Sequence, residues 1–324
     1  MLGQHIDLDW ESTCELGGSG MTDGRNRDIL DVVIIVVSYR SVRDLPRLIA
    51  SVAPSAADLT WHLIVVDNAG EDLGSQLAPD HRVTVFDAGA NLGYSGGINV
   101  GLTHMPPARW VVFLNPDLVL QPNALSRLVA VPDQVAASVP RILDAHGVCQ
   151  SSLRREPTLL RALGDAAFGA AWPGRPAWLS ETVRHDRQYR TKHTVDWATG
   201  AALAVRSDVI SAVGEWDEAT FFMYSEETDY ARRIRTIGGV LLYVPDAVVE
   251  HHGGGSGVSP QLDALQEVNR VRYFAKWHAP LATASFTAVT LLRNVVRPHR
   301  PGARAATAAL LSARVRASLP GGAR

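Results

Sequence analysis

The sequence predicts an α/β fold with a largely parallel sheet. Residues 31–40 (DVVIIVVSYR) form a continuous β-branched run, which is typical of a strand buried on both faces of a parallel sheet. Further apolar runs alternate with segments of helical spacing along the first 130 residues, and this alternation is the pattern of βαβ units.

The remaining elements follow this first strand along the chain. A strand from 61 turns at Asp67-Asn68, and a third covers 83–89. Helices are expected at 45–52 and 122–130, a Gly-rich loop opens a helix at 91–105, and a fourth strand covers 109–120. Residues 140–196 are irregular and predict loops and short helices over the sheet.

The second half returns to regular patterns. Residues 195–210 predict a strand followed by a helix start at Ser207-Asp208. A loop then feeds a helix with Tyr230, Ile234 and Ile237 on one face, and Gly238-Gly239 stop it. Residues 239–257 predict a strand region and a Gly-rich turn, and the chain from 261 on is helical, basic and Ala-rich.

Composition is that of an ordinary globular protein. Of the 324 residues, 46% are hydrophobic and 20% charged, and the two cysteines, Cys14 and Cys149, provide neither a disulfide framework nor a metal cluster. Residues 1–28 are polar and Gly-rich without an apolar signal segment, so we expect a disordered leader, with Met21 as an alternative start. No window reaches the roughly 18 uncharged apolar residues of a membrane span.

Charge is distributed unevenly along the chain. Residues 1–267 carry 21 basic and 33 acidic groups, a net of −12, whereas the chain after Glu267 has ten basic groups and no Asp or Glu. We therefore expect three parts, the leader, a domain over 29–257 and a basic helical extension over 258–324. The extension predicts a polyanionic partner such as a membrane surface, and its uncharged stretch 279–292 suits the bilayer interface. The alternative is a solvated helix that packs a homodimer.

Polar residues follow the predicted strands at their carboxyl ends, where ligands bind in such sheets. These are Ser38-Tyr39, Asp67-Asn68 and Asn115-Pro116-Asp117. A carboxylate at Asp117 could hold a divalent cation bound to a diphosphate, which needs only one or two protein carboxylates, although this tripeptide is also a plain strand-to-turn signal. Asp67 could accept the N3–H of a pyrimidine, or it could form an Asx turn.

Two further segments remain ambiguous on their own. The loop NLGYSGGIN (91–99) could cradle phosphates, or its glycines could serve a tight loop–helix junction. His251 and His252 close a strand, where an imidazole can ligate a metal. Both cannot face inward, because successive strand side chains alternate.

The acidic cluster SEETD (225–229) fits a helix start. With Ser225 as N-cap, Glu226 and Glu227 occupy the first turn, and Asp229 can pair with Arg233. Glu226 and Asp229 share one face, whereas Glu227 points about 100° away and is free to face a cleft.

Taken together and in order, these motifs resemble the family 2 glycosyltransferases of GT-A fold over roughly residues 31–257. The motifs are the first strand with Ser-Tyr, VVDN, NLGYSGGIN, FLNPD, WATG, GEWDEATFFMYSEETD and VEHHGGGS. The intervening stretch VPRILDAHGVCQSSLRREPTLLRALGDAAFG is similar to bacterial rhamnosyltransferases that act on polyprenyl-diphosphate-linked sugars.

The resemblance implies a role for each matching position. Glu227 would be the catalytic base, with Glu in place of the usual Asp. Asp117 and His251 would hold Mg²⁺ or Mn²⁺, with Asn115 in place of the first acid of the metal motif. The implied donor-nucleotide contacts are Ser38, Tyr39, Asp67, Asn91, Gly93, Tyr94, Gly97 and Asn115. The implied contacts on the acceptor and sugar side are Trp197, Thr199, Gly200 and Glu226.

The implied activity is an inverting transfer of L-rhamnose from dTDP-rhamnose to a glycan or lipid-linked acceptor, at the inner face of the cytoplasmic membrane. The alternatives are another donor, such as UDP-galactofuranose, UDP-glucose or UDP-GlcNAc, and a soluble natural-product acceptor. An alternative from a different functional class is a non-catalytic protein that binds nucleotides or nucleic acid. No nucleic-acid partner is expected, because the basic extension lacks interleaved aromatic residues and the acidic body would repel a polyanion.

Overall fold

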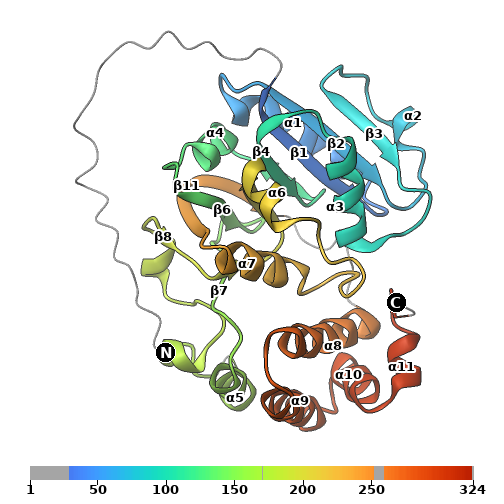
Figure 1. Cartoon of the computed structure of the whole chain (residues 1–324), viewed down its shortest axis with the longest axis vertical. Helices are drawn as coiled ribbons and strands as arrows, with labels where there is room; N and C mark the ends of the chain where they lie inside the picture. Colours follow the sequence, from blue (N-terminus) through green and yellow to red (C-terminus); the bar gives the residue numbers. More distant parts are fainter. Residues whose placement is uncertain (1–28, 170, 252–258, 323–324) are drawn as a thin grey trace.

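The structure, a computed structural model, describes residues 29–169, 171–251 and 259–322 (Figure 1). The leader 1–28 with Met21 and Cys14, and His252 with the Gly-rich turn after it, lie outside the described residues. The strands are β1 (Leu30–Ser38), β2 (Trp61–Asp67), β3 (Val83–Asp87), β4 (Ala108–Leu114), β5 (Leu118–Leu120), β6 (Val135–Leu143), β7 (Leu153–Arg154), β8 (His193–Thr194), β9 (Trp197–Ala198), β10 (Ala202–Arg206) and β11 (Val240–His251).

Helices alternate with these strands, and in the described residues only helices follow the last strand. The α-helices are α1 (Leu45–Ala56), α2 (Leu73–Gln76), α3 (Gly93–His104), α4 (Ala124–Val129), α5 (Leu159–Phe168), α6 (Ser207–Val213), α7 (Glu226–Thr236), α8 (Pro260–Trp277), α9 (Pro280–Val295), α10 (Pro301–Leu311) and α11 (Ala313–Ala317). Short 3₁₀ turns cover Ala177–Leu179 and Asp186–Tyr189. Prolines open α8, α9 and α10, where a missing N–H costs no helical hydrogen bond.

The main sheet has the strand order β3-β2-β1-β4-β10-β6-β11-β5, with β8 paired to β11. Neighbours from β3 to β4 are parallel, as are β6 and β11, whereas β10, β5 and β8 run antiparallel to their partners. The predicted α/β fold with a mostly parallel sheet is confirmed.

The first strand shows why the sheet is buried on both faces. Val32, Ile34 and Val36 pack into one core with α1 and α4. The alternate residues Val33, Ile35 and Val37 pack into a second core with α3, α6 and α7. Because side chains alternate along a strand, a continuous apolar run serves both cores at once.

Three strand predictions are wrong in detail. The run 109–120 is not one strand, because the chain leaves the sheet at Asn115-Pro116-Asp117 and returns as β5 on the far side of β11. The run 195–206 is likewise divided between β9 and β10. Residues 135–143 contain an unpredicted buried strand, β6, whose Pro140 argues against a central strand in sequence reasoning.

The middle segment covers the sheet only in part, since Leu153, Val183 and Tyr189 join the second core whereas α5 lies elsewhere than predicted. Instead of covering the sheet, α5 packs against α9, and Ala162, Phe274 and Phe286 form one apolar cluster. Figure 1 shows α5 beside the C-terminal helices at the end of the molecule away from β1 and β2. Ile237 also departs from the prediction, because it follows α7 and is 52% exposed while Tyr230 and Ile234 are buried. Gly238, with φ of +85°, ends this helix as expected.

The C-terminal extension is helical, as predicted, but many of its charges are paired within the protein. Arg270 pairs with Glu181 at 2.6 Å, and Lys276 pairs with Asp217 at 2.7 Å. Arg293 pairs with Glu267. Across the described parts of the chain, no helix is long and apolar enough to cross a membrane. The boundary predicted at 257/258 falls among residues that the structure does not describe, so the division into domains stays a prediction.

Candidate active site

The carboxyl ends of β1 and β2 lie side by side, because Ser38 pairs in register with Asp67. Both residues are buried. Asp67 Oδ1 accepts a hydrogen bond from the Ala69 N–H at 3.1 Å, so this residue forms the Asx turn that the sequence left open. The Ser38 hydroxyl is buried and has no hydrogen-bond partner among the described residues. Tyr39, next along the chain, is 41% exposed.

Asn68 joins this sheet edge to the Gly-rich loop. Its amide donates to Asn91 Oδ1 at 3.1 Å and to the Gly93 carbonyl at 3.0 Å, and its oxygen accepts from the Leu92 N–H. Sequence reasoning placed Asn68 at the ligand-binding edge of the sheet and in a turn, but gave it no contact with this loop.

The glycines of this loop allow close packing of protein on protein. A Cβ on Gly97 would lie 2.6 Å from Cγ1 of Val37, and one on Gly93 would collide with the Phe222 carbonyl. Gly93 also has φ of +77°, which favours glycine. These contacts favour the loop–helix junction over a phosphate cradle. Donor contact by this loop stays a prediction.

Asp117 and His251 face each other, although 133 residues separate them in the chain. Antiparallel pairing of β5 with β11 places Leu118 opposite His251. His251 Nε2 then lies 3.3 Å from Asp117 Oδ1, and their side chains are 22% and 10% exposed. An imidazole nitrogen and a carboxylate are both ligands for divalent cations, so this pair fits the predicted metal site. Within the described residues, no group of three or more His, Cys, Asp or Glu side chains is placed so that it could hold a metal ion.

Tyr94 connects this pair to the acidic cluster. Burial raises the pKa of its phenol, and the nearby carboxyls of Glu226, Glu227 and Asp117 raise it further. Its hydroxyl donates to the Gly200 carbonyl at 3.2 Å. Asn115 lies at the same edge, where its N–H donates to the Ala201 carbonyl. The structure therefore gathers the predicted base, metal pair and W-A-T-G segment around one tyrosine.

Helix α7 begins with unusual backbone geometry. Tyr224 and Ser225 have φ of +71° and +69°, a conformation that L-residues rarely adopt and that proteins tolerate mainly at functional sites. Ser225 occupies the N-cap position, but its side chain makes no capping hydrogen bond. The predicted Asp229–Arg233 pair is present at 3.0 Å.

Glu226 and Glu227 differ in their surroundings. Glu226 is 6% exposed and, in contrast to Glu227, does not line the cavity described below. Burial, and then the neighbouring Glu227, raise the pKa of Glu226 well above its ordinary value. Helix-start electrostatics therefore do not account for Glu226, contrary to the sequence interpretation.

Glu227 faces a cavity. Burial raises the pKa of its carboxyl, and the positive charge of Arg154 opposes this shift. Arg154 lies on β7 and lines the same cavity, yet sequence reasoning assigned it no function. Its position depends on the pairing of β7 with β9, which local patterns do not reveal.

The W-A-T-G segment forms the wall beside Glu227. Trp197 and Thr199 line the cavity, and a Cβ on Gly200 would lie 3.5 Å from Cβ of Glu227. The cavity has a volume of about 720 Å³. Helices α8, α9 and the α9–α10 connection provide much of its remaining wall, including Arg270, Arg297 and Arg300.

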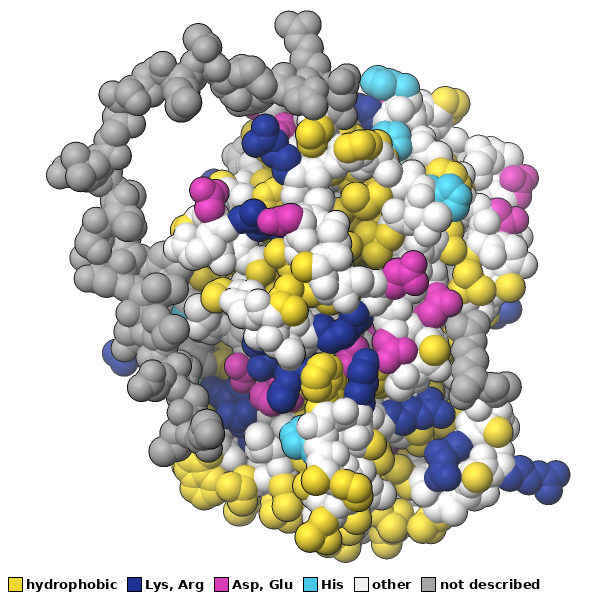
Figure 2. Space-filling view, in the orientation of Figure 1, with side chains coloured by type: hydrophobic (Ala, Val, Ile, Leu, Met, Phe, Trp, Pro, Cys, Tyr) yellow, Lys and Arg dark blue, Asp and Glu magenta, His cyan; other side chains and the backbone are white. Residues whose placement is uncertain are grey.

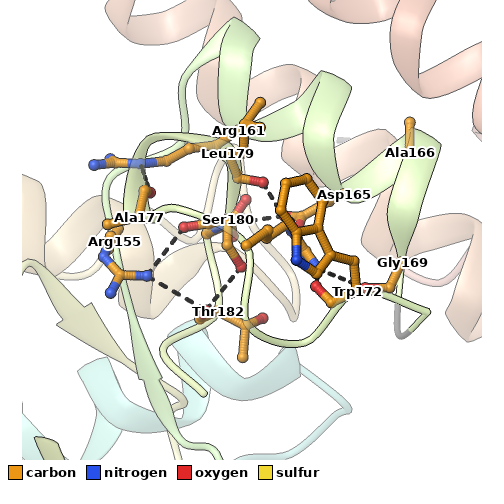
Figure 3. A network of polar contacts seen from close by, with 12 residues as sticks. Arg155, Arg161, Asp165, Ala166, Gly169, Trp172, Ala177, Leu179, Ser180 and Thr182 are labelled. Atoms are coloured by element: carbon orange, nitrogen blue, oxygen red, sulfur yellow. Dashed lines mark hydrogen bonds and ion pairs between the residues drawn. The ribbon is translucent and has the colours of Figure 1, made fainter. Parts of the chain in front are cut away.

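A network of polar contacts fixes α5 at the edge of this cavity (Figure 3). Arg161 donates to the Ala177 carbonyl at 3.3 Å, and Arg155 donates to the carbonyls of Ser180 and Thr182 at 3.2 and 3.4 Å. The buried Arg175 pairs with Asp165. The segment after α5 is thus held in one arrangement although it has little regular structure.

Comparison with known proteins gives consistent similarities. Residues 33–147 match the model of the family described as "Glycosyl transferase family 2". The chain is 29% identical over 276 residues to "N-acetylglucosaminyl-diphospho-decaprenol L-rhamnosyltransferase" of Mycobacterium tuberculosis (strain ATCC 25618 / H37Rv), covering 78% of this chain and 88% of the relative. It is also 29% identical to "Low-salt glycan biosynthesis hexosyltransferase Agl10" of Haloferax volcanii, over 63% of this chain and 62% of that protein.

Among solved structures, the fold is similar to "Crystal structure of GalNAc-T7 with UDP, GalNAc and Mn2+". The TM-score is 0.61 at 16% identity, and the match covers 82% of this chain and 52% of that one. The chain therefore spans about half the length of that structure, and the likeness supports the predicted GT-A type of fold.

Proposed function

Because this chain carries a glycosyl transferase family 2 domain and is a glycosyltransferase, we propose that it transfers L-rhamnose from dTDP-rhamnose to a polyprenyl-diphosphate-linked sugar. The observation that carries the proposal is the position of Glu227, which lies in a cavity beside Gly200 and whose carboxyl, like that of Asp117, acts on the Tyr94 phenol. The mycobacterial relative, similar over most of both chains, supports the choice of the transferred sugar and of the acceptor.

Glu227 is the proposed base. It accepts the proton of the acceptor hydroxyl while the hydroxyl oxygen bonds to the anomeric carbon of the donor. The bond from that carbon to the phosphate oxygen breaks, and the nucleoside diphosphate leaves with the electron pair. One displacement inverts the anomeric centre and needs no enzyme nucleophile. A raised carboxyl pKa suits the role, because a base works best with a pKa near the working pH.

Asp117 and His251 are the proposed holders of Mg²⁺ or Mn²⁺, an ion that supplies positive charge to the leaving diphosphate when bound. Two protein ligands are enough, since phosphate oxygens and water complete the coordination. The hydroxyl of Ser38, which has no hydrogen-bond partner among the described residues, and the carboxylate of Asp67 lie in register at the same sheet edge, where they are proposed to contact the nucleotide.

Replacing the base tests this mechanism. Glu227→Gln should lower kcat by about 10²–10⁴-fold while donor binding changes little, because the amide keeps the shape of the side chain but cannot accept the proton. Near-normal kcat in this variant would contradict the assignment of Glu227.

A donor screen tests the choice of sugar. The reaction should be fastest with dTDP-rhamnose among dTDP- and UDP-linked sugars, and preference for UDP-galactofuranose, UDP-glucose or UDP-GlcNAc would replace rhamnose in the proposal. The non-catalytic alternative does not stand, because the chain carries a glycosyltransferase domain. Attachment to the inner face of the cytoplasmic membrane, where such acceptors are anchored, remains part of the proposal.

A further inference from the structure

The cavity that Glu227 faces has an excess of positive charge. Seven arginines and five carboxylates line it. Three of the arginines are neutralised in the pairs Arg175–Asp165, Arg270–Glu181 and Arg293–Glu267. Within the described residues, the other four form no ion pair; they are Arg154, Arg184, Arg297 and Arg300. Such a wall attracts an anion larger than a single carboxylate.

Two of these arginines lie at the connection between α9 and α10. Arg297 donates hydrogen bonds to the carbonyls of Ala166 and Arg293, which hold its guanidinium at the junction of α5 with α9. The Arg300 side chain makes no hydrogen bond or ion pair with the described residues, although it lines the cavity. Guanidinium groups bind phosphate oxygens through charge-assisted hydrogen bonds.

The same junction borders an exposed apolar surface, which we call the α5–α9 face. On α9 the exposed side chains follow helical spacing and none is polar or charged; they are Pro280, Leu281, Ala284, Ala288, Leu292 and Val295. On α5 the exposed side chains are likewise all apolar; they are Leu160, Leu163, Ala167 and Phe168. Figure 2 shows hydrophobic side chains gathered along the edge of the molecule where Figure 1 places α5 and α9.

The apolar face and the cavity meet at Phe168. This side chain is 39% exposed, lines the cavity, and stacks edge-on against Trp172 with ring centroids 5.0 Å apart. On the α9 side, the exposed Val296 directly precedes Arg297. A ligand with an apolar tail and an anionic head could therefore keep its tail at the face and place its head on the arginines.

We propose that Arg297 and Arg300 bind the diphosphate of a membrane-embedded lipid acceptor, and that the α5–α9 face lies in the bilayer interface beside them. The proposal rests on the proposed transfer to a lipid-linked acceptor. A bilayer fits this face better than a second copy of the chain does, because an arginine-lined cavity opens at its border. An apolar helix face rimmed by basic groups is the pattern of interfacial helices, and arginines near an anionic surface strengthen its attachment.

Vesicle flotation tests the face. The full chain should float with vesicles of phosphatidylcholine and phosphatidylglycerol, and Leu281→Glu combined with Leu292→Glu should reduce the bound fraction at least about tenfold. Val148→Glu is the matched control, since Val148 is 61% exposed in the turn after β6 and should leave binding unchanged. If the double variant instead halves the mass in sedimentation velocity and leaves flotation unchanged, the face is a dimer contact and the proposal is wrong.

Binding of farnesyl diphosphate tests the arginines. The titration is made in EDTA, which removes the metal that the donor diphosphate needs. Arg300→Gln and Arg297→Gln should each weaken binding about tenfold or more, whereas Arg304→Gln, an exposed arginine of α10 outside the cavity, should not. Unchanged farnesyl diphosphate affinity together with weaker vesicle binding would show that these arginines hold lipid headgroups, which overturns the subsite.

Both measurements are independent of turnover. If no sugar is transferred from any donor but farnesyl diphosphate binding still depends on Arg297 and Arg300, the proposed function fails and the subsite stands. If rhamnose is transferred but the arginine variants bind and react like the unaltered chain, the subsite fails alone.

Discussion

The indole Nε1–H of Trp277 donates a hydrogen bond to Oδ1 of Asp229 at 2.9 Å. Asp229 lies in the first turn of α7, two residues after Glu227, and its side chain is only 1% exposed. Lys276 and Arg233 also donate to this carboxylate, at 2.9 and 3.0 Å. Through these hydrogen bonds the buried Asp229 joins helix α8, which forms part of the cavity wall, to helix α7, which carries the proposed base.

Asp229→Asn should therefore destabilise the protein strongly. The amide keeps the shape but removes the charge that compensates Arg233 and one of the two carboxylates that compensate Lys276, and breaking a buried pair costs about 3–5 kcal/mol. Urea unfolding measures this loss in the free energy of unfolding. Asp208→Asn is the control, because its partner Arg206 and its own carboxylate, 64% exposed, form a surface pair worth about 0–1 kcal/mol. Equal losses in the two variants would contradict the role of Asp229.

Removing the Asp117 carboxylate should weaken metal binding. The measurement is a titration of Mn²⁺ into the full chain with the nucleoside diphosphate present. Mn²⁺ should bind at least about tenfold more weakly to Asp117→Asn, because Asp117 is the carboxylate of the Asp117–His251 pair and a hard cation prefers carboxylate oxygen. Asp87→Asn, at the carboxyl end of the edge strand β3, is the control and should bind Mn²⁺ normally. An unchanged affinity in Asp117→Asn would move the metal away from this pair.

The sequence predicted the elements whose signals are local. The β1 run serves two cores at once, and the acid that points away from Glu226 and Asp229 does face a cavity. It did not predict β6, because Pro140 argues against a central strand. Whether the missing N–H of a proline costs a hydrogen bond depends on which strands pair with β6, and that pairing is known only from the folded sheet.

Long-range contacts account for what else was missed. The sequence offered Asp117 and His251 as separate candidate metal ligands and joined them in one site only through a resemblance, since their approach requires β5 to leave β4 and pair with β11. The function of Arg154 and the cavity wall from α8 to α10 depend on the packing of distant segments. The positive φ of Tyr224 and Ser225 has no sequence signal, because neither residue type favours that conformation.

Arg154 should set the pH dependence of the reaction. Its positive charge favours the ionised form of Glu227 and so lowers a carboxyl pKa that burial raises. Without this charge the pKa rises further, and the acidic limb of kcat/KM against pH should move to higher pH. Arg154→Gln should therefore lose about tenfold or more in kcat/KM on the acidic limb, with a smaller loss at high pH. Arg154→Lys keeps the charge and should keep the limb, whereas an unmoved limb in Arg154→Gln would exclude the electrostatic role.

The Glu226 carboxyl should lower the free energy of unfolding at neutral and alkaline pH. Burial and the neighbouring Glu227 raise its pKa in the folded protein, so the folded chain holds a proton that the unfolded chain has already released. Below the ordinary carboxyl pKa of 4.5 both states are protonated and nothing is lost. As the pH rises from there toward the raised pKa, the unfolded state is favoured progressively.

Glu226→Gln removes this titration and should match the unaltered protein near pH 4 but melt higher at pH 8. For a chain of this size each kcal/mol corresponds to about 2–4 °C in Tm. Calorimetry across this range measures the difference, and Glu215→Gln, an exposed position before α7, should show none of it. A lower Tm for Glu226→Gln at pH 8 would mean that the ionised carboxylate is stabilised in the folded protein, opposite to the direction that its burial beside Glu227 requires.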